Sequence, residues 1–333
     1  MTNRSFGRLS VVIPNYNYGR FVAAAIGSAL AVEWPDVEVI VVDDGSTDNS
    51  REVIDGFGDR VHALFQTNRG PREACNAGYA VSTGDIVIFL DSDDMLCPSI
   101  AQEVNEVWRP GVSKVQVQMV KIDEHGRAGG AVFPRLKRTP SPADVRRWLI
   151  TMSAYPTPPG SGNAYSREFL EQLLPIDDRC GDAMDSACLA AAPLLGDVVT
   201  LRRVLVGYRQ HGANRSALRD GAVFRRQIDR AYQRQAFVLE LLGLTHSQGA
   251  AISALFRSRH LLQMRVAERR LNHPAPPPLP TDSRRRMVHD AVRGFAATGP
   301  EPVTVRIATS IWALGVLVLP SYVARRLIHR RFS

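Results

Sequence analysis

Three carboxylates occur within four residues of the sequence, in the segment Asp91-Ser92-Asp93-Asp94. Carboxylates this close repel one another, and burying them is costly unless a cation is present. Their hard oxygen atoms suit Mg²⁺ or Mn²⁺, ions that usually bridge protein carboxylates and the phosphates of a substrate. The segment therefore predicts a metal site; the alternative is a solvated acidic turn that caps the next helix.

A second acidic pair, Asp43-Asp44, is followed by Gly45-Ser46. One of its carboxylates can accept a hydrogen bond from a ribose hydroxyl or a pyrimidine N–H, a contact that selects a nucleoside. The alternative is an Asx turn and helix cap that also involves Asp48. Neither G-x-G-x-x-G after the first expected strand nor G-x-x-x-x-G-K-[ST] occurs, so the usual dinucleotide and P-loop sites are not expected.

The acidic residues follow continuous apolar runs, which are typical of strands buried on both faces of a parallel sheet. Strands are expected at 9–13, 37–42, 61–66 and 85–90, with helices at 21–32, 50–57 and 71–82. This alternation predicts an α/β fold with right-handed crossovers. Ligands bind at the carboxyl ends of such strands, where Asn15, Asp43-Asp44 and the 91–94 segment are expected to meet.

Beyond residue 100 the pattern is mixed. The sequence predicts a strand at 115–122, helices at 143–152, 169–174 and 185–195, a strand at 198–209 and Arg-rich helices over 222–272. Five prolines in 273–281 indicate a semi-rigid linker. The expected parts are a catalytic domain over 1–220, with halves 1–100 and 101–220, a helical extension over 221–272, a linker over 273–282 and a separate basic helical tail over 283–333.

Four segments together resemble successive blocks of the inverting family 2 glycosyltransferases: LSVVIPNYNYGRFVAAAIGSAL, VEVIVVDDGSTDNS, NRGPREACNAGYAVSTGDIVIFLDSDD and VLVGYRQHGANRS. The resemblance is dense over 9–98 and sparse over 160–216. It implies a GT-A fold, a Rossmann-like and mostly parallel sheet flanked by helices, here with an α-helical C-terminal extension. It also implies a nucleotide-diphosphate sugar donor (UDP-sugar favoured), Mn²⁺ or Mg²⁺, and one-step displacement at the anomeric carbon.

The resemblance implies that Pro14 and Asn15 line the nucleoside pocket and that Asp44, together with Asp43, contacts the base or ribose. Arg72 is a weaker candidate for a phosphate contact, because the surrounding block departs from the family pattern.

The same resemblance makes Asp91 and Asp93 the D-x-D pair, with Asp93 the direct metal ligand and Asp94 its neighbour. His211 would contact the metal or the donor diphosphate, and Arg209 would offset phosphate charge as the leaving group becomes more negative.

An inverting transfer also needs a carboxylate that takes the proton from the acceptor hydroxyl. The family places this base on a helix shortly before a Gly and a strand, a position that Asp185 fits, eleven residues before Gly196. The usual acid just before the base is Met184 here, so Asp182 is a second candidate. Alternatively, Asp185 is only a helix N-cap.

The C-terminal tail combines an uncharged run, 307–324, with nine Arg and two acidic residues over 283–333, a net charge of +7. Eighteen residues make about 27 Å of helix, slightly short of a bilayer core of ~30 Å. Three interpretations stay open: insertion into an anionic membrane surface, packing on the catalytic domain, and a spanning segment. Stacking aromatics are not interleaved with the Arg residues, so nucleic acid is not an expected partner.

The cysteines form no C-x-x-C pair, and the five-residue apolar run at the N-terminus is too short for a signal peptide. Residues 1–100 carry seven Arg and fourteen acidic residues, net −7, so the total of +8 leaves +15 for residues 101–333. We expect a cytoplasmic enzyme, peripheral on the inner face of the cell membrane, that extends a lipid-linked or polymeric glycan acceptor.

Two other functions are compatible with the sequence. The first is a nucleotide-sugar-binding protein without transferase activity. The second is a Mg²⁺-dependent phosphoacceptor signalling domain. Such a domain needs a lysine after a late strand of the sheet, and none of the three lysines is expected there. A cleft surrounded by Asp44, Asp93 and Asp185 would favour the transferase.

Overall fold

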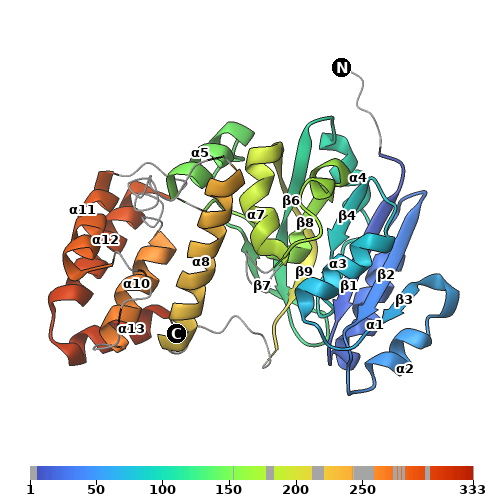
Figure 1. Ribbon diagram of the computed structural model, residues 1–333, viewed down its shortest axis with the longest axis horizontal. Helices are drawn as coiled ribbons and strands as arrows, with labels where there is room; N and C mark the ends of the chain where they lie inside the picture. The colour runs from blue at the N-terminus through green and yellow to red at the C-terminus, as the bar shows by residue number, and fades with distance from the viewer. Residues whose placement is uncertain are drawn as a thin grey trace. The chain divides into compact units, whose positions relative to one another are not determined.

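The computed structural model describes residues 6–152, 154–177, 184–211, 221–241, 243, 259–272, 276, 279, 282–296 and 301–332 (Figure 1). The chain divides into two compact units. Unit 1 consists of residues 1–145 and 156–213, and unit 2 of residues 146–155 and 214–333.

The first half of unit 1 is a run of parallel strands and helices. Strands lie side by side in the order β3-β2-β1-β4 and are all parallel. The elements in chain order are β1 (Leu9–Asn15), α1 (Gly19–Leu30), β2 (Val37–Asp43), α2 (Ser50–Asp55), β3 (His62–Phe65), α3 (Pro71–Val81) and β4 (Ile86–Phe89). Residues 11–13 of the central strand β1 are fully buried, as expected for a strand covered on both faces. The prediction for this half is confirmed.

The second half continues the same sheet with mixed strand directions. β8 is antiparallel to β4 and to β6, whereas β6 and β9 are parallel, and β5 and β7 pair antiparallel with β9 and β6. The elements are β5 (Met95–Leu96), α4 (Ile100–Val107), β6 (Val112–Ile122), β7 (Ala128–Phe133), β8 (Asn163–Ser166), α6 (Arg167–Glu171), α7 (Met184–Leu195) and β9 (Asp197–Arg209). The sheet is therefore an α/β sheet flanked by helices, as predicted.

Unit 2 is helical, with α8, α10, α11, α12 and α13 gathered around one hydrophobic core. The helices are α5 (Pro142–Met152), which begins in unit 1, then α8 (Gly221–Leu241), α10 (Arg259–Leu271), α11 (Arg284–Ala296), α12 (Val303–Val318) and α13 (Ser321–Phe332). The guanidinium of Arg265 is buried in ion pairs with Asp282 and Asp290.

The expected separation of a tail after residue 282 is not observed. Ala313, Val316 and Leu317 of α12 pack in the same core as residues of α8 and α10, because the apolar residues that follow Ser310 give α12 a side to bury there. Most of the proline-rich linker lies outside the described residues, but Leu279 is buried in this core.

The uncharged run 307–324 is divided between two helices, since α12 ends at Val318 and α13 begins at Ser321. Within the part of the chain that the structure describes, no helix has both the length and the apolarity that crossing a membrane requires.

Candidate active site

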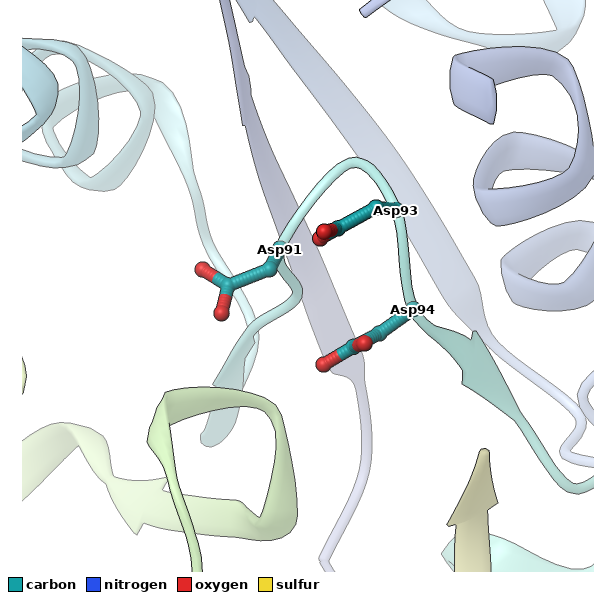
Figure 2. Close-up of side chains that lie close together, drawn as sticks. All are labelled: Asp91, Asp93 and Asp94. Carbon is teal, nitrogen blue, oxygen red and sulfur yellow. The ribbon is translucent and has the colours of Figure 1, made fainter. Parts of the chain in front are cut away.

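The acidic turn, which we define as Asp91, Asp93 and Asp94, lies between β4 and β5. Each residue offers a carboxylate oxygen within 4.8 Å of those of the other two. In Figure 2 the side chains project from one tight bend of the chain, with Asp93 and Asp94 pointing to the same side. Asp91 is exposed, Asp93 is half-buried and Asp94 is fully buried. The three predicted residues thus form one group of carboxylates with the spacing that a metal ion needs.

The crowding of the acidic turn changes its protonation. Desolvation, the charge of Asp93 and the charge of Asp185 raise the pKa of Asp91 to about 7, although the residue keeps contact with solvent. Burial and the charges of Asp91 and Asp93 raise the pKa of Asp94 well above its usual range. A divalent cation would relieve this repulsion, so the donor set fits Mn²⁺ or Mg²⁺.

Ser161 and Arg209 hold the turn in place. The Ser161 hydroxyl donates to Asp94 Oδ2 at 2.6 Å and accepts from the Asp91 amide at 3.1 Å. The backbone N–H of Arg209 donates to Asp94 Oδ1 at 3.0 Å, and its Nε donates to the carbonyl of Asp93 at 2.7 Å. Arg209 is buried and organises the turn; its predicted contact with a donor phosphate stays a prediction.

His211 lies beside the acidic turn, as predicted. Its Nε2 is 2.9 Å from Asp93 Oδ2, and its ring packs against the rings of Tyr18 and Phe21. Two residues that are 118 positions apart in the sequence, and that are both candidate metal ligands, are thereby in direct contact.

The carboxyl ends of β1 and β2 bring Asn15 and Asp43 together, with Asn15 Nδ2 donating to Asp43 Oδ1 at 2.8 Å. Asp43 also accepts from the Ser46 amide at 3.0 Å and from its hydroxyl at 2.5 Å. Asp43 therefore stabilises the turn that follows it, through a bond to the amide three residues on and not two residues on as in an Asx turn. The Oδ1 atom of Asn15 is buried and accepts no hydrogen bond from any described residue.

Asp44 anchors the chain that precedes α3. Its carboxylate accepts from Gln66 Nε2 at 2.7 Å and from the amides of Arg69 and Gly70, each at 2.8 Å. Arg72, in the first turn of α3, has its Nε 3.3 Å from Glu73 Oε1. The nucleoside and phosphate contacts expected of Asp44 and Arg72 stay predictions, as does the pocket-lining role of the neighbouring Pro14.

Asp185 lies in the first turn of α7, close enough to the acidic turn for its charge to act on Asp91. A Cβ atom at Gly160, one residue before Ser161, would lie 3.9 Å from the Cβ of Asp185, so the two residues are neighbours. The structure therefore brings the predicted base to the predicted metal site. The second candidate, Asp182, lies outside the described residues.

Lys114 was not expected near the site. It is fully buried on β6, and its ammonium donates to Thr157 Oγ1 at 3.1 Å. Burial lowers the pKa of Lys114 to about 7, opposed by the nearby charges of Cys188 and Asp185. Lys114 is one of only three lysines beside 38 arginines, and this rarity is the only sequence signal that marks it.

Ser161 was also not predicted. A serine between two glycines predicts only a loop. Its partners Asp94 and Asp91 lie 67 and 70 positions away in the sequence, so no local pattern indicates these contacts.

Residues 10–174 match the sequence model of Glycosyl transferase family 2, an interval that holds Asn15, Asp44, the acidic turn and Ser161. An uncharacterized glycosyltransferase of Nostoc sp. (strain PCC 7120) is 38% identical over 217 residues, which cover 62% of this chain and 66% of that protein. The chain belongs to glycosyl transferase family 2. The glycosyltransferase GlyG of Streptococcus pneumoniae serotype 4 is 38% identical over 106 residues, 29% of this chain.

This family 2 chain spans about two thirds of the length of the Nostoc relative and, at 35%, about a third of GlyG. Among solved structures, TarS of S. aureus, residues 1–349 in complex with UDP-GlcNAc, aligns with a TM-score of 0.52 at 15% identity. The alignment covers 96% of this chain and 92% of that structure. The similarity confirms the expected GT-A type of fold.

Proposed function

We propose that this family 2 protein transfers a sugar from a nucleotide-diphosphate donor to an acceptor hydroxyl, with a divalent metal ion and with inversion at the anomeric carbon. The observation that supports the proposal is that Asp185 neighbours Gly160, next to the Ser161 that bonds the acidic turn, and that its charge acts on Asp91. A base and a metal site so close together can serve the two ends of one displacement. Inversion is the outcome that family membership implies.

The metal ligands in this proposal are Asp91, Asp93 and His211. Asp94 is buried and hydrogen-bonded to Ser161 and Arg209, so it shapes the turn. When bound, the ion supplies positive charge that stabilises the diphosphate as it leaves.

Asp185 acts as the base. Its carboxylate accepts the proton of the acceptor hydroxyl while the hydroxyl oxygen forms the new bond to the anomeric carbon and the bond from that carbon to the diphosphate breaks. The proton then passes from Asp185 to solvent. Asn15 offers its buried Oδ1 to an N–H of the nucleoside base, beside Asp43 and Asp44.

The favoured donor is a UDP-sugar, which the UDP-GlcNAc in the TarS structure supports. We expect a lipid-linked or polymeric glycan as acceptor and a cytoplasmic location on the inner face of the cell membrane. The phosphoacceptor alternative is not retained, because the chain belongs to glycosyl transferase family 2.

The test is turnover with and without Asp185. UDP release from UDP-GlcNAc and UDP-glucose is measured with Mn²⁺, using water and a bacterial lipid extract as acceptors. We expect Asp185→Asn to keep the donor dissociation constant within about twofold and to lower UDP release by ~10²–10⁴. The control is Glu168→Gln, which changes an exposed acid in the first turn of another helix, α6.

Normal turnover of Asp185→Asn together with an inactive Asp182→Asn variant would move the base to Asp182. Donor binding by the wild type without UDP release from either sugar would favour the non-catalytic nucleotide-sugar-binding protein.

A further inference from the structure

Unit 2 exposes an unusual amount of apolar surface. Twelve large hydrophobic side chains are exposed in the described part of the chain, and eight of them fall between residues 292 and 322. They are Val292, Phe295, Val303, Ile307, Ile311, Val318, Leu319 and Tyr322. Isolated exposed apolar residues are ordinary, whereas a concentration of this kind marks an interaction surface.

The apolar face, which we define as Val303, Ile307, Ile311 and Val318, runs along one side of α12. Spacings of four, four and seven residues place these side chains on the same side of a helix. Ile311 is 60% exposed and Val318 is 64% exposed, whereas Leu317 is buried in the core of unit 2.

No charged residue occurs in α12 after Arg306. A helix that faces water on one side normally carries charged residues there. We therefore expect the exposed side of α12 to bind an apolar partner.

The two helices that pack against α12, α11 and α13, are rich in arginine. Residues 283–333 carry nine Arg against Asp290 and Glu301, net +7, and Asp290 is buried against Arg265. On α13, Tyr322, Arg326 and Arg330 follow one another at intervals of four and are all exposed, Tyr322 by 77%. The other exposed arginines of α11 and α13 are Arg284, Arg285, Arg293 and Arg325.

We propose that α12 lies flat in the surface of an anionic membrane, with the apolar face in the acyl region and the arginines of α11 and α13 on the lipid headgroups. Sixteen residues give about 24 Å of helix, suited to lying in the interface plane. A second copy of the chain is the weaker partner, because it would bring a like-charged surface to this one. The idea that this membrane also carries the sugar acceptor rests on the proposed function. Lipid binding is measured without sugar transfer, so the membrane proposal and the proposed function can fail separately.

The test is flotation of the full-length protein with vesicles of phosphatidylcholine alone or with 30% phosphatidylglycerol, in low and high salt. We expect binding to the anionic vesicles at low salt and a loss of at least about tenfold in high salt or on neutral vesicles. Ile311→Asp with Val318→Asp should weaken binding about tenfold or more. Val204→Asp, at an exposed valine of β9, is the matched control and should have no effect.

Arg326→Gln with Arg330→Gln should also weaken binding to anionic vesicles at least tenfold, whereas Arg202→Gln with Arg203→Gln on β9 should not. Circular dichroism of each variant confirms that it is folded. Binding that ignores lipid charge, or that survives the Ile311→Asp and Val318→Asp changes in a folded protein, would overturn the proposal. Light scattering that shows a wild-type dimer, dissociated by Ile311→Asp with Val318→Asp, would also overturn the proposal. The apolar face would then bind a second copy of the chain.

Discussion

At the scale of single residues, Ser161 connects two parts of the site. Its hydroxyl is a donor to Asp94 and an acceptor for the amide of Asp91, so it fixes the bend on which the proposed metal ligands stand. Residues that orient metal ligands in this way contribute to metal affinity without touching the ion. The sequence predicts acidic residues at strand ends as candidate ligands. It does not predict the role of Ser161, because this role depends on hydrogen bonds that form only when the chain is folded.

We predict that Ser161→Ala raises the dissociation constant of Mn²⁺ about tenfold, because Asp94 and the Asp91 amide lose their shared partner. Free Mn²⁺ is measured by electron paramagnetic resonance, without any sugar substrate. Ser166→Ala is the control, since this buried hydroxyl caps α6 and its loss should cost about 1 kcal/mol of stability but no metal affinity. Equal Mn²⁺ affinities for the wild type and Ser161→Ala would contradict this role.

Lys114 gives a pH-dependent prediction for stability. Because burial lowers the pKa of Lys114 from 10.5 to about 7, the unfolded chain holds a proton at this residue between these pH values that the folded chain has released. Unfolding therefore takes up a proton in this range. As the pH rises from 7 to 10, Lys114 increases the wild-type free energy of unfolding by at most about 1.4 kcal/mol per pH unit.

The variant Lys114→Met lacks this contribution. The free energy of unfolding of Lys114→Met minus that of the wild type should fall as the pH rises from 7 to 10, and urea unfolding at several pH values measures it. Lys121→Met, which removes a lysine that is not fully buried from the same strand, is the control. If the two variants behave alike, Lys114 does not release its proton in the folded state.

At the scale of helices and strands, the parallel half of the sheet is predictable because its strands are apolar runs that alternate with helices. β7 and β8 are not, since one begins Ala-Gly-Gly-Ala and the other has four residues, Asn-Ala-Tyr-Ser. α12 shows a different limit. Its residues 311–318 are apolar on every side of the helix, and only the packing shows which side is covered by protein.

Two adjacent residues of α12 test that packing. We predict that Leu317→Ala lowers the free energy of unfolding by about 2–5 kcal/mol, because it leaves a cavity in the core of unit 2. Val318→Ala should change it by less than about 0.5 kcal/mol, since this side chain is exposed. Chemical denaturation of the full-length protein measures both. Similar losses for the two variants would mean that α12 does not use this side against the core.

At the scale of the whole molecule, the uneven charge has two separate explanations. The acidic excess of residues 1–100 includes the carboxylates of the proposed metal site, whereas most of the basic excess of 283–333 lies on α11 and α13, which pack against α12. Because α12 and α13 complete the core of unit 2, removing the chain after Thr298 would expose that core. Point substitutions therefore test the membrane role better than truncation.

The central claim is that the acidic turn binds a metal ion together with a nucleotide sugar. Calorimetry with UDP-GlcNAc, in Mn²⁺ or in a chelator, tests it most directly for the wild type, Asp93→Ala and the control Asp59→Ala, an exposed acid after α2. We predict that the wild type and Asp59→Ala bind the donor only with Mn²⁺, and that Asp93→Ala binds it at least about tenfold more weakly. Wild-type affinity and unchanged Mn²⁺ dependence in Asp93→Ala would contradict the account.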